Sequence, residues 1–422
     1  MEKKLGKKIS RRTFLKGAVA GTALLGPGIP YIAKKAVAAE PLYIGVVSPA
    51  SGNYADHGMM ERMGMQMAVA EIKTVLDRPV KTLVEDDETD PQVGARKARR
   101  LIEVDKVKFM MGGVSSSVAV SVSEVAQRAG VLYIETNQNS DTLTGEKAHR
   151  CCFRVPSDMA MALKCLGPYI IEHVGKKWYF FTHDYEWGWS GTRWGRKVLE
   201  KYGGTEVGES KVPLNTRDFS AFLLKARAAK PDALVITVGG IDRAALMEQT
   251  YEFGIYKEMT IVHTLYDYED VWAAGPEKNF GIHGTEWFYG IDTPTVKEFV
   301  AKYKKMFPAA LIPVPTQDTA NGYIAMRELL RAIQRVGKED VTAVIKALEG
   351  HTIPVTESLK NDPIYIREWD HQFVWAYYVV RSKKPAEMKD RADFFELLKW
   401  VPGKDIARTK EENPIKLEPY PS

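Results

Sequence analysis

The residues best suited to bind a ligand follow an apolar run that ends in two glycines, Gly112 and Gly113, and three serines that end at Ser117. An apolar run that stops at glycines and restarts with helical spacing indicates a strand, a tight turn and a helix. Ligands of open parallel sheets collect at the carboxyl ends of strands, and the free N–H groups of a helix start attract anions. We therefore expect an anion-binding corner here, and we expect Ser116 or Ser117 to cap the helix.

The elements that position this corner alternate along the chain from Leu42 onwards. Strands are expected at 42–48, 80–84, 107–111, 131–134, 177–182, 205–212, 233–238, 260–264 and 370–380. Helices are expected at 55–76, 91–104, 118–129, 163–173, 191–202, 219–229, 243–253, 294–307, 320–336 and 341–348, with Asp90 as the cap of the second. This alternation predicts βαβ units and parallel sheets. The length exceeds what one core usually serves, so we expect an α/β protein with two lobes.

Residues 1–39 are typical of an export signal. The stretch from Ser10 to Lys16 resembles a twin-arginine motif, and the apolar segment behind it is broken by Pro27 and Pro30. Small residues at 36–38 offer a cleavage site, so the mature chain is expected to begin near residue 39 or 40. We expect the twin-arginine translocase to export the protein to the periplasm, and a basic cytoplasmic tail is the alternative.

The charge of the chain divides in the same place. The full sequence has a net charge of +5, but residues 1–39 contain nine Lys or Arg and one acidic residue, so the remainder is close to −3. The basic character therefore belongs to the signal. Nothing in the rest of the chain favours a nucleic acid or an anionic membrane surface as a partner.

The three cysteines, Cys151, Cys152 and Cys165, are too few for a disulfide scaffold. Two interpretations stay open. Either Cys165 pairs with one of the adjacent two, or all three are buried thiols. The chain has no metal-ligand spacing and no cofactor motif, so neither a metal nor a cofactor is expected.

Several short stretches, in this order, resemble the leucine/isoleucine/valine-binding proteins of ABC importers. They are 43–52, 54–58, 68–72, 85–91, the Gly-Gly-x-Ser-Ser-Ser corner at 112–117, 183–188 and 217–220. Each is a weak signal alone, but their order and spacing are specific, and the resemblance extends from Leu42 to Val380.

The resemblance implies a type I periplasmic binding protein, an α/β fold with two Rossmann-like lobes, three hinge crossovers and a ligand cleft between the lobes. The crossovers are expected near Pro156, near Trp287 and at 358–370. The N-terminal lobe would then comprise 40–157 and 288–358, the C-terminal lobe 158–287 and 359–400, and a C-terminal tail 401–422. Closure of the lobes would bury the ligand, and the membrane permease subunits of the importer would recognise the closed form.

The resemblance also implies site residues in the first lobe. The carboxylate-binding serine of the family falls on Ser115, and the helix start at Ser116 would supply backbone N–H groups. Asn139 stands where the family has a threonine, with Asn137 beside it, although both asparagines could simply shape a turn. His57 stands where the family places a ring against the ligand, and a surface histidine is the alternative.

In the second lobe, Tyr185 and Trp187 follow a strand and could stack on the ligand or pack within the lobe. Amino-acid binders of the family usually place a glutamate after the strand at 260–264, where this chain has Leu265. Asp267 could substitute for it from two residues away. We therefore expect a ligand without an amine, such as an aromatic acid or an amide, to bind better than leucine. The aromatic residues expected to favour such a flat ligand are Tyr266, Tyr268 and Trp272.

Two other functions compete with solute binding. An exported enzyme would fit a twin-arginine signal, but the chain has no G-x-S-x-G, no H-E-x-x-H and no G-x-G-x-x-G after a strand. A ligand-binding sensory partner of the same fold is the other alternative. We expect a non-enzymatic binding protein that captures a small carboxylate or amide ligand.

Overall fold

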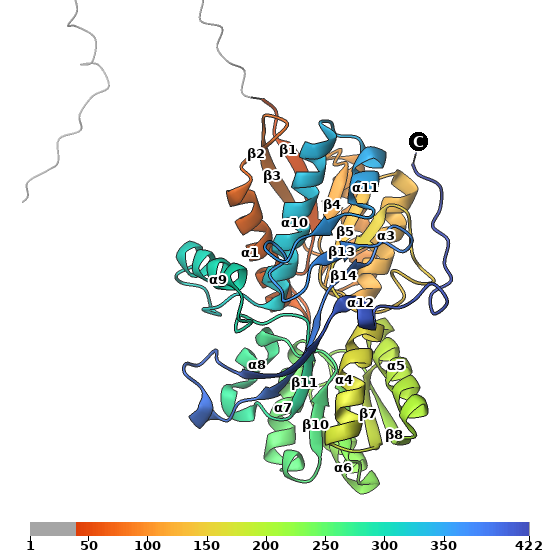
Figure 1. The fold of residues 1–422 in the computed structure, drawn as a ribbon, viewed down its shortest axis with the longest axis vertical. Helices are drawn as coiled ribbons and strands as arrows, with labels where there is room; N and C mark the ends of the chain where they lie inside the picture. Colours follow the sequence, from red (N-terminus) through yellow and green to blue (C-terminus); the bar gives the residue numbers. More distant parts are fainter. Residues whose placement is uncertain (1–38, 422) are drawn as a thin grey trace, which may run out of the picture. The chain divides into compact units, whose positions relative to one another are not determined.

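The computed structural model describes residues 39–421. The export-signal prediction therefore lies, apart from Ala39, outside the described residues. This part of the chain contains two large β-sheets flanked by helices, and a small third sheet (Figure 1). No helix within it has the length and apolar character needed to span a membrane.

The first lobe is built on a six-stranded sheet in the order β2-β3-β1-β4-β5-β6. Its strands are β1 (Leu42–Val47), β2 (Thr74–Val75), β3 (Arg78–Glu85), β4 (Phe109–Met111), β5 (Leu132–Glu135) and β6 (Cys152–Arg154). All neighbours pair in parallel except β2 with β3. Its helices are α1 (Ala55–Glu71), α2 (Pro91–Glu103), α3 (Ser116–Ala129), α9 (Pro294–Met306), α10 (Gln317–Val336) and α11 (Val341–Leu348). Asp90 caps α2 as predicted, because its side chain accepts hydrogen bonds from the backbone of the first turn.

Helices α1 and α10 approach each other closely at two glycines. A Cβ atom on Gly64 would lie 2.0 Å from the Thr319 carbonyl oxygen, and one on Gly322 would lie 2.3 Å from the Glu61 carbonyl oxygen. Only glycine allows the backbones to come this near. The contact brings the start of α10 beside the start of α1, although more than 250 residues separate them in sequence.

The second lobe is built on a seven-stranded sheet in the order β16-β15-β11-β10-β9-β7-β8. Its strands are β7 (Lys177–His183), β8 (Thr205–Val212), β9 (Ala233–Thr237), β10 (Thr260–His263), β11 (Ile282–Thr285), β15 (Tyr377–Ser382) and β16 (Phe395–Val401). The last two strands add to the parallel sheet in the antiparallel sense. Its helices are α4 (Met159–His173), α5 (Glu186–Tyr202), α6 (Ser220–Ala229), α7 (Ile241–Glu252) and α8 (Tyr268–Ala274), and α12 (Gly403–Ile406) packs against α4.

The chain passes between the two sheets at 155–158, at 286–293 and at 375–376. The prediction of one strand over 370–380 is wrong, because β14 (Phe373–Val374) pairs with β13 (Ile364–Ile366), whereas β15 pairs with β11. A small third sheet is completed by β12 (Thr352–Ile353). The break falls at Trp375, whose indole N–H donates to Ser157 Oγ at 2.8 Å in the first passage.

Two local predictions need correction, and the open question about the cysteines is decided. The helix expected over 55–76 ends at Glu71, because Leu76 and Asp77 take φ values of 53° and 58° and turn the chain between β2 and β3. Helix α3 begins at Ser116, so its N-cap position is held by Ser115 and not by Ser116 or Ser117. The three cysteines are free thiols, all buried, which decides against the disulfide.

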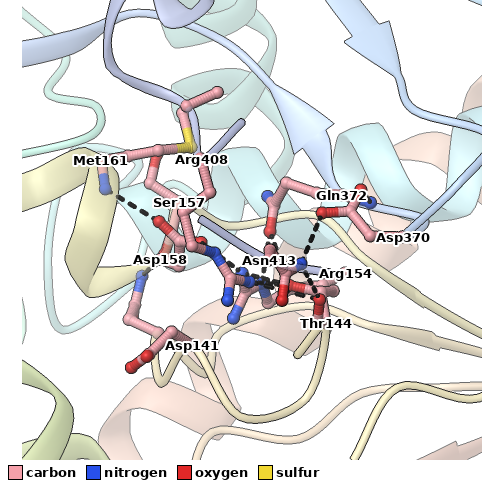
Figure 2. A network of polar contacts seen from close by, with 12 residues as sticks. Asp141, Thr144, Arg154, Ser157, Asp158, Met161, Asp370, Gln372, Arg408 and Asn413 are labelled. Carbon is pink, nitrogen blue, oxygen red and sulfur yellow. Dashed lines mark hydrogen bonds and ion pairs between the residues drawn. The ribbon is translucent and has the colours of Figure 1, made fainter. Parts of the chain in front are cut away.

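A buried ionic network surrounds the first passage between the sheets (Figure 2). Asp158, at the N-cap of α4, forms an ion pair with Arg154 at 3.1 Å and accepts a hydrogen bond from Arg408 Nε at 2.8 Å. Both guanidinium groups also reach Thr144 Oγ1, at 2.7 and 2.8 Å. The end of β6, the start of α4 and the C-terminal segment are thereby joined across the hinge.

The segment expected as a C-terminal tail takes part in this network. Arg408 and Asn413 are both buried, and the Asn413 amide donates to the Thr144 carbonyl at 2.7 Å. Arg367 pairs with Asp370 and donates to the Arg408 carbonyl at 2.6 Å. Residues 407–421 are therefore packed onto the first lobe as part of the fold.

Candidate functional site

A small pocket lies between the carboxyl ends of the two parallel sheets. The free space within it is about 20 Å³, which is the scale of one water molecule. A ligand of several heavy atoms therefore needs the two lobes or their side chains to separate before it enters. The pocket is lined by Tyr54, His57, Val114, Ser116, Asn137, Asn139, Tyr185, Trp187, Gly239, Leu265, Asp267, Gln317 and Asp318.

The structure brings most of the predicted site residues into this lining. They are His57, Ser116, Asn137, Asn139, Tyr185, Trp187 and Asp267. Ser115 and Tyr266 do not line the pocket. The Tyr266 ring stacks on His263 with centroids 4.4 Å apart, and its hydroxyl donates to Met247 Sδ at 3.1 Å. Tyr266 is therefore part of the second lobe's core.

The lining follows an alternating pattern at four chain segments. In each, residues i and i+2 face the pocket while the residue between them does not. Successive side chains of an extended backbone point to opposite sides, and both Ser115 and Asp267 have extended φ and ψ values. The extended backbone at Ser115 therefore accounts for its exclusion, whereas Tyr266 is held by its packing against His263 and Met247. The four pairs are Val114 and Ser116, Asn137 and Asn139, Tyr185 and Trp187, and Leu265 and Asp267.

The strand-turn-helix corner has the geometry expected from its glycines. Gly112 and Gly113 have φ values of 109° and 108°, and a Cβ atom on Gly112 would lie 2.4 Å from the Val47 carbonyl oxygen. The Ser115 side chain makes no capping hydrogen bond to α3. The first-turn N–H groups of this 14-residue helix thus keep their capacity to bind an anion, next to the Ser116 hydroxyl in the pocket.

Contacts across the pocket join the two lobes. The Tyr54 and Tyr185 hydroxyls lie 2.7 Å apart, and the Asn53 amide donates to the Gly239 carbonyl at 3.4 Å. The Asn139 amide nitrogen donates to the Ser157 carbonyl at 2.7 Å, so this side chain is tied to the first hinge passage. These bonds hold the lobes together in the described conformation.

Acidic side chains from both lobes meet around His57. Its Nδ1 lies 2.7 Å from Asp318 Oδ2, and its Nε2 lies 3.2 Å from Asp270 Oδ1. Arg243 Nη1 lies 3.2 Å from Asp267 and 3.1 Å from Asp270. His57 and Asp318 belong to α1 and α10, whereas the other three follow strands of the second lobe.

Burial and charge shift the pKa values of this cluster. Burial alone would lower the pKa of His57, but Asp270 and Asp318 outweigh it and raise that pKa well above its usual value. Burial raises the pKa of Asp267 to about 7, although Arg243 opposes the shift. Burial also raises the pKa of Glu269 well above its usual range, and Asp318 raises it further. Four carboxyl groups here share two cationic side chains, which favours binding of an additional positive charge.

Sequence reasoning missed several of these residues. Tyr54, Gln317 and Asp318 line the pocket, and Asp270 and Arg243 hold its charged groups in place. Gln317 and Asp318 belong to the first turn of α10, which the sequence places far from the other site residues. The sequence signal for Gln317 and Asp318 was the pair Gly64 and Gly322, because a glycine on each helix allows α1 and α10 to approach closely.

Comparison with known proteins decides the family. Residues 41–388 match the family model described as "Periplasmic binding protein". The chain belongs to this family. The predicted type I periplasmic binding fold is thereby confirmed, and membership supports a solute-binding role in the periplasm.

Individual relatives agree with this family. The Leu/Ile/Val-binding protein homolog 7 of Brucella suis is 28% identical over 75% of this chain and 83% of its own length. A periplasmic binding protein from Burkholderia mallei is 28% identical, with a TM-score of 0.82, and the match covers 89% of this chain and 98% of that one. An amino acid ABC transporter substrate-binding protein from Pseudomonas fluorescens is 27% identical, with a TM-score of 0.79, covering 86% and 96%.

Proposed function

We propose that this periplasmic binding protein is the solute-binding component of a branched-chain-amino-acid-type ABC importer. It captures a small carboxylate or amide ligand between its lobes, delivers it to membrane permease subunits and catalyses no reaction. The names of its relatives, a Leu/Ile/Val-binding homolog and an amino acid ABC transporter substrate-binding protein, support this role. A twin-arginine signal at residues 1–39 would bring it to the periplasm.

One observation carries the choice of ligand. The uncapped start of α3, with Ser116, shares the pocket with Asp267 and Asp318. A carboxylate suits the helix start, and a positively charged group suits the acids. We therefore favour a ligand with an amino-acid head group. Leu265 stands where amino-acid binders of the family have a glutamate, and this favoured a ligand without an amine. However, Asp267 lines the same pocket, so a carboxylate is available to bind the ammonium group of a ligand.

Lobe closure follows from contacts that exist only when the lobes meet. The Tyr54–Tyr185 hydrogen bond and the His57–Asp270 pair both join the two lobes. A ligand that touches both α3 and Asp267 adds to these contacts and so shifts the population toward the closed form. A sensory partner would use the same closure, and the neighbouring genes would distinguish the two roles.

A matched pair of serine variants tests the site. Ser116 lines the pocket and Ser115 does not, so Ser116→Ala should weaken ligand binding by about 1.5–3 kcal/mol, whereas Ser115→Ala should weaken it much less. A thermal-shift screen across amino acids, amides and aromatic acids first identifies a ligand. Calorimetric titration of both variants with that ligand then gives the two losses. Equal affinity of Ser116→Ala and wild type would contradict the placement of the carboxylate.

A further inference from the structure

A second set of donor atoms lies beside the pocket and includes Glu269, which does not line it. One ligand atom from each of His57, Asp318 and Glu269 lies within 4.8 Å of the others. The Glu269 side chain is buried, its residue being 3% exposed, and neither carboxylate oxygen has a hydrogen-bond partner among residues 39–421. The Thr316 hydroxyl is near, but outside hydrogen-bonding geometry. A buried carboxylate without a partner is costly, so this group calls for a cation.

The contacts of His57 prepare it to act as a ligand. Its Nε2 faces Asp270 at 3.2 Å, and its Nδ1 faces Asp318. When Nε2–H donates to Asp270, the tautomer is fixed and the Nδ1 lone pair is directed toward Asp318. A carboxylate that orients a histidine in this way is the usual support of a metal-bound imidazole.

The local balance of charge supports the same conclusion. Arg243 forms ion pairs with Asp267 and Asp270. Among the described residues, Arg243 forms no ion pair with Asp318 or Glu269, and Asp318 pairs with His57. The two remaining carboxylates and one imidazole form a compact group in need of positive charge.

We propose that His57 Nδ1, Asp318 and Glu269 bind one divalent transition-metal ion, such as Zn²⁺ or Mn²⁺. One imidazole and two carboxylates suit these ions. Two ligand atoms of one tetrahedral Zn²⁺ lie about 3.4 Å apart, so the three side chains, whose donor atoms lie within 4.8 Å of one another, move closer together when the ion binds. His57 and Asp318 belong to the first lobe and Glu269 to the second, so the ion ties the lobes together. This proposal does not depend on which organic ligand the pocket takes.

The test uses the full chain, stripped with EDTA and then freed of chelator. Titration with ZnCl₂ or MnCl₂ by calorimetry, with the metal content measured by mass spectrometry, should give one ion per chain and a rise in melting temperature. Glu269→Gln, which preserves the shape of the side chain, should weaken metal binding at least about 10-fold. His173→Asn, at an exposed histidine on α4, should leave it unchanged.

The outcomes separate this proposal from the proposed function. Folding of the Glu269→Gln protein is checked by its melting temperature in EDTA, and His57→Asn provides a second variant should it not fold. Metal binding of unchanged strength in both variants, or no binding by wild type, would overturn the proposal. If the metal proposal fails in this way but the protein still binds an organic ligand in EDTA, the proposed function is unaffected. Loss of organic-ligand affinity in Glu269→Gln without any metal binding would assign the carboxylate to the ligand's ammonium group instead.

Discussion

The hinge network and the cleft cluster both bury acids and bases, yet they differ in how the charges are matched. In the hinge network, Arg154 and Arg408 pair with Asp158 (Figure 2), and Arg367 pairs with Asp370. In the cleft, four carboxyl groups share His57 and Arg243. Each aspartate of the hinge network has its own arginine partner, whereas in the cleft the carboxyl groups outnumber the cationic side chains. An excess of buried carboxyl groups favours the binding of positive charge.

Two aspartates show the contrast most clearly. Burial would raise the pKa of Asp158, but Arg408 and Arg154 outweigh it and lower that pKa below its usual value. Burial raises the pKa of Asp318, and His57 compensates only in part. The first carboxylate is therefore stabilised in its charged form by the fold, and the second is left to interact with a ligand.

The largest expected effect comes from breaking the hinge network. Arg154→Met would leave Asp158 with Arg408 alone and remove the donors to Gln372 and Thr144. Removing one partner of a buried pair costs about 3–5 kcal/mol of unfolding free energy. Denaturant unfolding measures the loss. The matched control is Arg196→Met, whose pairs with Glu206 and Glu209 are exposed and which should cost less than about 1 kcal/mol.

A smaller effect is expected from Glu61, which lies behind the pocket under Ser48 and Thr136. Burial raises its pKa to about 8, against hydrogen bonds from those two hydroxyls that lower it. Between its unfolded pKa and 8 the folded protein binds more protons than the unfolded chain, so stability falls as pH rises across this window. Glu61→Gln should remove roughly 2–4 kcal/mol of that fall. Denaturation curves at pH 5 and pH 8.5 give the unfolding free energy of wild type and of Glu61→Gln at each pH. An equal fall of this free energy in both proteins would contradict the raised pKa of Glu61.

Much of the fold was predictable because apolar runs and helical spacing repeat regularly from Leu42 to Val380. The corner at Gly112 and Gly113 was predictable for the same reason. The short strands β2, β6, β11, β12 and β13 were missed, since two to four residues carry too little periodicity. The seven-residue strand β16 was missed as well. The division of the chain into lobes by residue range stays a prediction.

The candidate site was predicted less well, for two physical reasons. Ser115 and Tyr266 were placed at the ligand because they follow strands. The extended backbone turns the Ser115 side chain away from the pocket, and Tyr266 packs into the core of the second lobe. Asp318 and Asp270 were missed because only the close approach of α1 to α10 and the meeting of the lobes bring them to His57.

The most direct test of the account compares amino acids with their amine-free analogues by calorimetry, in wild type and in Asp267→Asn. The pairs are leucine with 4-methylpentanoate and phenylalanine with 3-phenylpropanoate. An ammonium group held by a buried carboxylate contributes about 1.5–3 kcal/mol, so wild type should prefer the amino acid of a pair by about 10-fold or more, and Asp267→Asn should lose that preference. Equal or tighter binding of the amine-free acid by wild type would contradict the account.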